Sequence, residues 1–187
     1  MVAGMTTAVL RRTAGQLFMV GLPGPVLDEK TRDFLAEYTP GGVVLFKRNV
    51  TSGGQLRRLV AEVKATGAGV VPLVGIDHEG GRVHRLPRPF THFPPALTVA
   101  AGGPAAARRV GLAMGRELAA VGIDVDFAPV LDVWTNPRNR VIGDRAFGTT
   151  PAAAPEPFCQ RQSGPRLRCT APPAPTSSHP CALFAAP

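Results

Sequence analysis

Charged residues of opposite sign follow a short apolar run near the middle of the chain. The run Val70–Ile76 ends at Asp77, and two arginines, Arg82 and Arg85, follow three residues apart, after a Gly-Gly pair that permits a tight turn. A carboxylate accepts hydrogen bonds from sugar hydroxyls, and guanidinium groups donate to them. These residue types in this order favour a carbohydrate-binding site.

A simpler role suits the same spacing. Asp77 and either arginine can form a buried ion pair that braces the loop and contacts no ligand. The sequence alone leaves both interpretations open.

A second charged group surrounds the apolar run Ile123–Val130. In a regular strand Asp124 and Asp126 share one face, and Pro129 then turns the chain because it has no backbone donor. Asp132 follows on a long connection, and long connections of this kind are commonly functional.

Arg145 lies further along the same connection. It is therefore a candidate for the same site as Asp77. The alternative is that Asp144 and Arg145 form an ordinary surface pair, which their spacing does not exclude.

The elements that must position these residues alternate between two patterns. Continuous apolar runs, typical of strands buried on both faces, occur at Leu17–Gly21, Gly42–Phe46, Val70–Ile76 and Ile123–Val130. Segments of helical period lie between them, at Asp28–Tyr38, Ser52–Thr66 and Pro104–Val121. This alternation predicts an α/β fold with a parallel sheet.

A closed barrel is favoured over an open nucleotide-binding sheet. An open sheet of that class normally carries a glycine fingerprint directly after its first strand. Here that position, Gly21–Pro25, contains two prolines, which lack the backbone donors that a phosphate needs. At 187 residues the chain is shorter than the roughly 250 residues of a closed (β/α)8 TIM-type barrel, so only the N-terminal half is expected.

Composition limits the partners. The net charge is +8, but the basic residues are scattered and the chain has a single Trp and a single Tyr, so no nucleic-acid partner is expected. No apolar run is long enough to span a membrane. The N-terminus lacks the order of a secretory signal, which predicts a cytoplasmic protein. No His/Cys/Asp cluster has ligand spacing, so neither a metal nor an organic cofactor is expected.

The chain changes character after Thr150. Residues 151–187 hold nine prolines, one acidic residue and all three cysteines, with no Val, Ile, Met or Lys. We therefore divide the chain into a partial barrel domain, 1–150, and a tail, 151–187. The tail is expected to be disordered and to supply no barrel strand. Two explanations stay open, a natural low-complexity tail and an out-of-frame translation of a GC-rich gene.

Six sequence blocks carry a family resemblance. They occur in order at Gly15–Gly21, Gly41–Asn49, Ile76–Arg85, Phe90–Pro94, Asp126–Asp132 and Ile142–Gly148. Together they resemble the N-terminal barrel domain of glycoside hydrolase family 3, and most closely its β-N-acetylhexosaminidases. The resemblance covers about Arg12 to Pro151. One departure is His78, at a position where relatives often carry Gln.

The resemblance implies roles for four residues. Asp77, Arg85 and Arg145 would contact an N-acetylglucosamine unit, and Arg82 would support the loop. The family retains anomeric configuration through a glycosyl-enzyme intermediate on an Asp, and in this branch a His serves as acid and base. Both groups lie downstream of the matched region, so no catalytic residue is expected within this chain.

The resemblance implies an enzyme acting on terminal β-linked N-acetylglucosamine. The role would be cell-wall recycling or chitin-fragment breakdown, and this chain would be an inactive fragment. The alternative is a non-catalytic module that binds N-acetylglucosamine. The sequence predicts no oligomeric state and does not choose between muropeptide and chitooligosaccharide, or between hydrolysis and phosphorolysis.

Overall fold

The computed structural model describes residues 6–67, 69–150 and 184–185. Four parallel strands form the sheet in the order β1-β2-β3-β4, and a short β5 follows on the far edge of β4. Their bounds are Met19–Gly21 (β1), Gly42–Leu45 (β2), Leu73–Ile76 (β3), Val125–Asp126 (β4) and Phe184–Ala185 (β5). Sequential order without reversal is the arrangement of a barrel, which confirms the predicted partial barrel.

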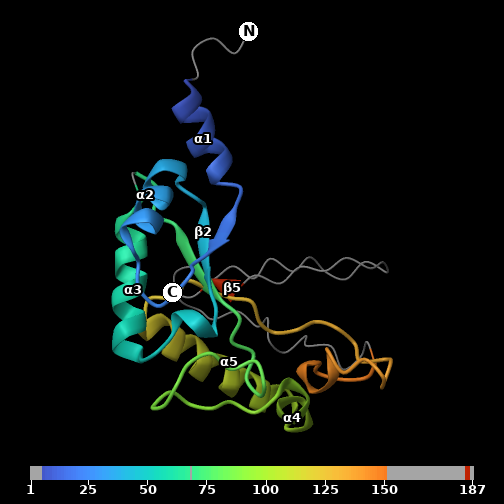
Figure 1. The fold of residues 1–187 in the computed structure, drawn as a ribbon. Coiled ribbons are helices and arrows are strands. Elements are labelled where there is room, and N and C mark those ends of the chain that lie inside the picture. Colours follow the sequence, from blue (N-terminus) through green and yellow to red (C-terminus); the bar gives the residue numbers. More distant parts are fainter. Residues whose placement is uncertain (1–5, 68, 151–183, 186–187) are drawn as a thin grey trace.

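Helices connect the strands, and one further helix precedes the first strand (Figure 1). Their bounds are Thr7–Gly15 (α1), Glu29–Tyr38 (α2), Gly53–Ala65 (α3), Ala96–Ala101 (α4) and Gly103–Ala120 (α5), with 3-10 turns at Lys47–Asn49 (η1) and Gly143–Arg145 (η2). In the part of the chain that the structure describes, no helix is both long and apolar enough to cross a membrane.

The predicted helices form where capping residues begin them. The Asp28 carboxylate accepts from the backbone N–H of Thr31 at 2.7 Å, and the Ser52 hydroxyl accepts from that of Gln55 at 3.1 Å. Each bond satisfies a donor that the first helical turn leaves open. The sequence did not predict α1 or α4, since neither carries a clear apolar period.

The core lies between the sheet and helices α3 and α5. The predicted apolar face of α3 is buried throughout, at Leu56, Leu59, Val60 and Val63. This face packs in one cluster with side chains of β2 and β3 and with Met114 and Leu118 of α5. Burial of this apolar surface holds the helices against the sheet.

The first strand differs from its prediction. The run Leu17–Gly21 was expected to be buried on both faces, yet Leu17 is 84% exposed, Phe18 62% and Met19 38%. Among the described residues β1 pairs only with β2, so no neighbour covers its outer side. An apolar run predicts a buried strand only when the chain supplies both neighbours.

The fourth strand is shorter than the predicted Ile123–Val130. Its ladder to β3 covers Val125 and Asp126, and the Phe127 amide donates to Ile76 just beyond. Pro129 then has no N–H to continue the ladder.

The tail lies outside the described residues except at β5. Phe184 and Ala185 pair antiparallel with β4, against the direction of barrel strands. The pair is not a barrel strand, but the sequence analysis did not foresee any contact between the tail and the sheet. The rest of the 151–187 prediction, and its boundary, stay predictions.

Candidate functional site

The site is built where β3 and β4 end side by side. Their register pairs Ile76 with Asp126, so Asp77 follows β3 at the level where β4 finishes. The carboxyl ends of parallel strands form the ligand-facing edge in barrels and open sheets. The predicted charged residues therefore gather at the edge where a site is expected.

A glycine turn shapes the segment after β3. Gly80 and Gly81 have positive φ values of 88° and 52°. A Cβ at Gly80 would lie 2.6 Å from the Pro94 carbonyl oxygen, and one at Gly81 2.7 Å from Pro95 Cβ. The turn is tied by the Glu79 amide, which donates to the Val83 carbonyl at 2.9 Å. Only glycine fits this turn without strain, and the turn places Glu79 and Arg82 on either side of it.

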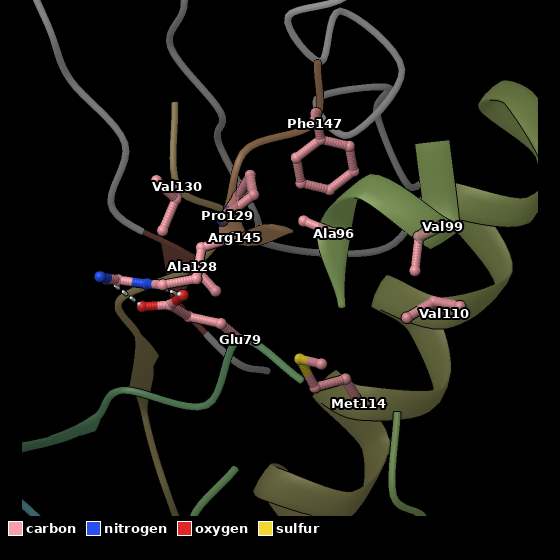
Figure 2. Close-up of a pocket in the computed structure, with 10 residues that line it drawn as sticks. All are labelled: Glu79, Ala96, Val99, Val110, Met114, Ala128, Pro129, Val130, Arg145 and Phe147. Atoms are coloured by element: carbon pink, nitrogen blue, oxygen red, sulfur yellow. Dashed lines mark hydrogen bonds and ion pairs between the residues drawn. The ribbon is translucent and has the colours of Figure 1, made fainter. Parts of the chain in front are cut away.

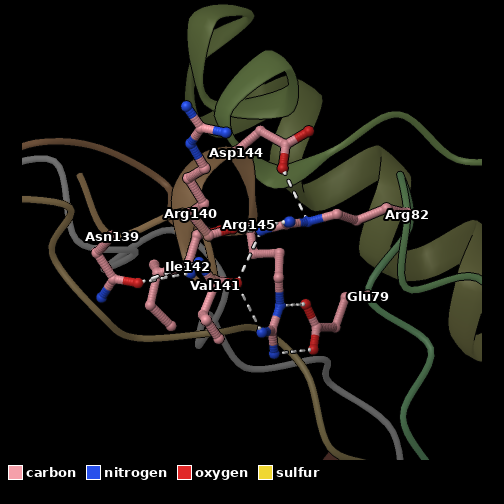
Figure 3. A network of polar contacts seen from close by, with 8 residues as sticks. All are labelled: Glu79, Arg82, Asn139, Arg140, Val141, Ile142, Asp144 and Arg145. Atoms are coloured by element: carbon pink, nitrogen blue, oxygen red, sulfur yellow. Dashed lines mark hydrogen bonds and ion pairs between the residues drawn. The ribbon is translucent and has the colours of Figure 1, made fainter. Parts of the chain in front are cut away.

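Arg145 is held by Glu79, not by Asp144. Its Nε and one Nη donate to the two Glu79 carboxylate oxygens, both at 2.8 Å, and the other Nη donates to the Val141 carbonyl at 3.1 Å (Figure 3). The Glu79 side chain is only 7% exposed. The hydrogen bonds that Arg145 donates to Glu79 raise the pKa of Arg145, burial lowers it in part, and the charges of Glu79, Asp132 and Asp77 raise it by smaller amounts. The surface pair that the spacing of Asp144 and Arg145 allowed does not form.

Sequence analysis missed Glu79. Glu79 lies in the block Ile76–Arg85, which also contains Asp77. Charged residues that follow a buried strand in this block are candidates for the site. Glu79 is an acidic residue two positions after Asp77, and this spacing could have identified it as a second site residue.

Arg82 braces the loop that carries Arg145. Its guanidinium donates to the carbonyls of Arg140, Val141 and Ile142 at 2.7–2.9 Å and lies 3.3 Å from the Asp144 carboxylate (Figure 3). These contacts suit the supporting role that the resemblance implied. They leave a direct contact between Arg82 and a ligand as a prediction.

Asp77 and Arg85 form a looser pair. The nearest nitrogen of Arg85 is 3.9 Å from an Asp77 carboxylate oxygen, a distance too long for a hydrogen bond. The Arg85 Nε is buried and has no acceptor within the described part of the chain. The Asp77 carboxylate and the terminal nitrogens of Arg85, which are partly exposed and do not bond to each other, keep hydrogen-bonding capacity that a ligand can use. The structure brings Asp77, Arg85 and Arg145 to one end of the sheet, while their role as sugar ligands stays a prediction.

Asp126 and His78 join the two strand ends. The His78 amide donates to the Asp126 carboxylate at 2.9 Å, and the His78 ring Nδ1 accepts from the Arg85 amide at 3.1 Å. Burial, with smaller contributions from the charges of Asp77 and Glu79, raises the pKa of Asp126 to about 8, against the lowering effect of the bond from the His78 amide. Burial also lowers the pKa of His78 to about 3, with smaller contributions from His84, Arg85 and His92. At neutral pH both side chains are uncharged.

Asp124 has a structural role. Its carboxylate accepts from Lys64 Nζ at 2.6 Å and from the Val74 amide at 2.8 Å. Val74 lies near the start of β3, away from Asp77. Asp124 therefore fixes helix α3 to the sheet and does not join the site.

A small apolar hollow adjoins the Glu79–Arg145 pair (Figure 2). It is lined by side chains of α4 and α5, by residues 128–130 and by Phe147. Across the described ranges, no group of three or more His, Cys, Asp or Glu side chains is arranged to hold a metal ion.

Comparison with known proteins places this geometry among glycosidases. The model of the glycosyl hydrolase family 3 N terminal domain matches residues 9–156. A β-hexosaminidase of Methylococcus capsulatus is 47% identical over 137 residues, covering 71% of this chain and 40% of the relative. One of Thioalkalivibrio sulfidiphilus is 44% identical over 140 residues, with the same coverage. The chain thus spans about 40% of the length of these relatives.

Solved structures agree with the sequence matches. NagZ from Neisseria gonorrhoeae in complex with N-trifluoroacetyl-D-glucosamine superposes with a TM-score of 0.66 at 38% identity, covering 72% of this chain and 42% of that one. A family 3 β-N-acetylglucosaminidase from a Paenibacillus species gives a TM-score of 0.72 at 36% identity, covering 80% and 29%.

Proposed function

Because this chain belongs to glycosyl hydrolase family 3, we propose that it forms the sugar-binding part of a β-N-acetylhexosaminidase acting on terminal β-linked N-acetylglucosamine. The single observation that supports this best is the gathering of Asp77, Arg85 and Arg145 at the ends of β3 and β4, with donors and an acceptor to spare. A neutral sugar needs both kinds of group, because each hydroxyl donates and accepts.

Each of the three residues has a distinct part in the proposal. The Asp77 carboxylate accepts from a sugar hydroxyl, since Arg85 at 3.9 Å does not saturate it. The terminal N–H groups of Arg85 and the free N–H groups of Arg145 donate to neighbouring hydroxyls. The related NagZ, which was solved with a glucosamine derivative, makes a sugar of this class the natural ligand to test.

Cleavage requires groups beyond these three. A retaining glycosidase needs a nucleophile and an acid/base about 5 Å apart. The resemblance assigns both to positions downstream of the matched region. We therefore propose binding without turnover for the 187-residue polypeptide, and expect no release of aryl alcohol from an aryl β-N-acetylglucosaminide. His179, which follows Ser177 and Ser178 in the tail, is a histidine that could be taken for the acid/base. Turnover that disappears in His179→Ala would contradict the proposal.

The cellular compartment and the substrate class are part of the same proposal. The enzyme would act in the cytoplasm on muropeptides or chitooligosaccharides. Turnover measured on both substrate classes with a family member that carries the downstream segment would choose between them.

Binding of N-acetylglucosamine to the 187-residue chain tests the proposal directly. In a calorimetric or NMR titration, Asp77→Ala and Arg145→Ala are expected to weaken binding at least tenfold, about the value of one or two hydrogen bonds to a charged group. Arg32→Ala is the matched control, because Arg32 also pairs with a glutamate, Glu62, but on the outer helices. If the sugar does not bind to the unaltered, folded chain, the proposal is wrong.

A further inference from the structure

The guanidinium of Arg145 is only partly free to bind a ligand. Of its five N–H groups, two donate to Glu79 and one to the Val141 carbonyl. One N–H therefore remains on each terminal nitrogen. Figure 3 shows Glu79 meeting the guanidinium edge-on, with the carboxylate along one side of the fork.

Glu79 also matches the charge of Arg145. The carboxylate and the guanidinium meet through two hydrogen bonds of 2.8 Å, and the Glu79 side chain is nearly excluded from solvent. The other two arginines of the site are matched as well, Arg85 by Asp77 at 3.9 Å and Arg82 by Asp144 at 3.3 Å. Each of these three arginines thus has its own carboxylate.

We propose that Glu79 determines the specificity of the site by making it select neutral sugars over anionic ones. The inference rests on the proposed sugar-binding function. With Glu79 in place, Arg145 offers two N–H groups without net positive charge, which is what a pair of hydroxyls requires. A carboxylate or phosphate on the sugar would lose its hydration and gain no compensating charge.

Two further carboxyl groups affect the net charge around Arg145. Asp132 is exposed, and its charge acts on Arg145 through space. Asp126 holds its proton at neutral pH, because burial raises its pKa to about 8. Glu79 already pairs with Arg145, so Asp132 adds a further negative charge that acts on Arg145. This further charge also disfavours an anionic ligand.

A purely structural role for Glu79 makes a different prediction. If Glu79 only held the Arg145 side chain in place, its loss would weaken every ligand by the same factor. The charge role predicts a change in the ratio between neutral and anionic ligands. The ratio therefore separates the two roles.

The test compares three sugars on the full 187-residue chain. The probes are N-acetylglucosamine, its 6-phosphate, and N-acetylmuramic acid, which carry no charge, a charge at C6 and a charge at C3. We expect the unaltered chain to prefer the neutral sugar. In Glu79→Gln that preference should fall about tenfold for at least one anionic sugar, the effect of one unit charge a few ångströms away in a partly solvated site. Glu79→Asp, which keeps the charge, should restore it.

Asp132→Asn is the second variant. Its side chain is exposed, so the fold tolerates the change, and the preference should shift in the same direction by a smaller factor. An unchanged ratio in a folded Glu79→Gln, or in Asp132→Asn if Glu79→Gln does not fold, overturns the inference and leaves the sugar site intact. Absence of binding to the unaltered chain overturns the sugar site and the inference together.

Discussion

The connections after β3 and β4 both reach the candidate site, but they are held in different ways. The segment after β3 is tied by its own backbone: the Val83 amide donates to Gly80, and the Gly81 amide to Phe93 at 2.8 Å. It also buries Leu86 and Phe93 in the core. Residues 131–142 after β4 are mostly exposed. Arg82 and Glu79, from the first segment, form hydrogen bonds with Val141 and Arg145 of the second.

The comparison shows a dependence in one direction. The first connection is ordered by its own backbone bonds. The second has local bonds at Asn136 and Asn139, and the contacts of Arg82 and Glu79 fix it further from the first. Disruption of the glycine turn should therefore disturb both segments. Disruption of the arginine contacts should disturb only the second.

The largest effect is expected from Gly80→Ala. Its new Cβ would meet the Pro94 carbonyl oxygen at 2.6 Å, in a backbone conformation that disfavours side chains. The free energy of unfolding in chemical denaturation should fall by about 3 kcal/mol. Gly54→Ala on α3 is the control, because its Cβ meets only the end of Arg58 at 3.8 Å. A Gly80→Ala chain as stable as the Gly54→Ala chain would show that the turn does not depend on glycine.

A second effect concerns Asp126, which joins the two strand ends. The folded chain keeps the Asp126 proton up to about pH 8, whereas the unfolded chain releases it near pH 3.8. The folded state therefore binds more protons across this window, and the stability contribution of Asp126 falls as pH rises.

Asp126→Asn removes this dependence and keeps an acceptor for the His78 amide. The stability of the unaltered chain relative to the variant should fall by about 2–3 kcal/mol between pH 5 and pH 7. The lowered pKa of His78 acts in both proteins and cancels from the difference. Parallel stability profiles for the two proteins would mean that Asp126 is ionised in the fold.

The smallest effect is expected from Arg82→Ala. Three carbonyl contacts and the pair with Asp144 are lost, but the Arg82 side chain is 46% exposed, so the global cost should be about 1 kcal/mol. Amide exchange at residues 140–145 should accelerate while that at 79–83 stays unchanged. Arg32→Ala, in a pair of equal exposure, should alter neither segment. Acceleration in both segments would contradict the one-way dependence.

Sequence patterns predicted the parts of the fold that depend on local periodicity. The apolar face of α3 is confirmed, because a helical period is encoded within a few residues. The burial of β1 was predicted wrongly, because it depends on a neighbouring strand and not on the run itself.

The position of the site could be predicted from the sequence, but the carboxylate that pairs with Arg145 could not. Strand ends locate Asp77, Arg85 and Arg145 at one edge, since parallel strands carry their carboxyl ends there. The partner of Arg145 was not predictable, because Glu79 lies 66 residues away and the adjacent Asp144 is an equally good carboxylate by type. In the structure Arg145 pairs with Glu79, which lies next to the Gly80 turn, and Asp144 pairs with Arg82 instead.

In the described part of the chain the outer edge of β1 has no partner strand, and this affects how copies of the chain associate in solution. Leu17 and Phe18 expose apolar surface beside a strand edge, which attracts further copies of the chain, and the net charge of +8 opposes that approach. Salt shortens the reach of the repulsion to roughly 8 Å at physiological ionic strength and leaves the apolar attraction intact. Light scattering should therefore show self-association that grows as salt is added, and Phe18→Lys should suppress it.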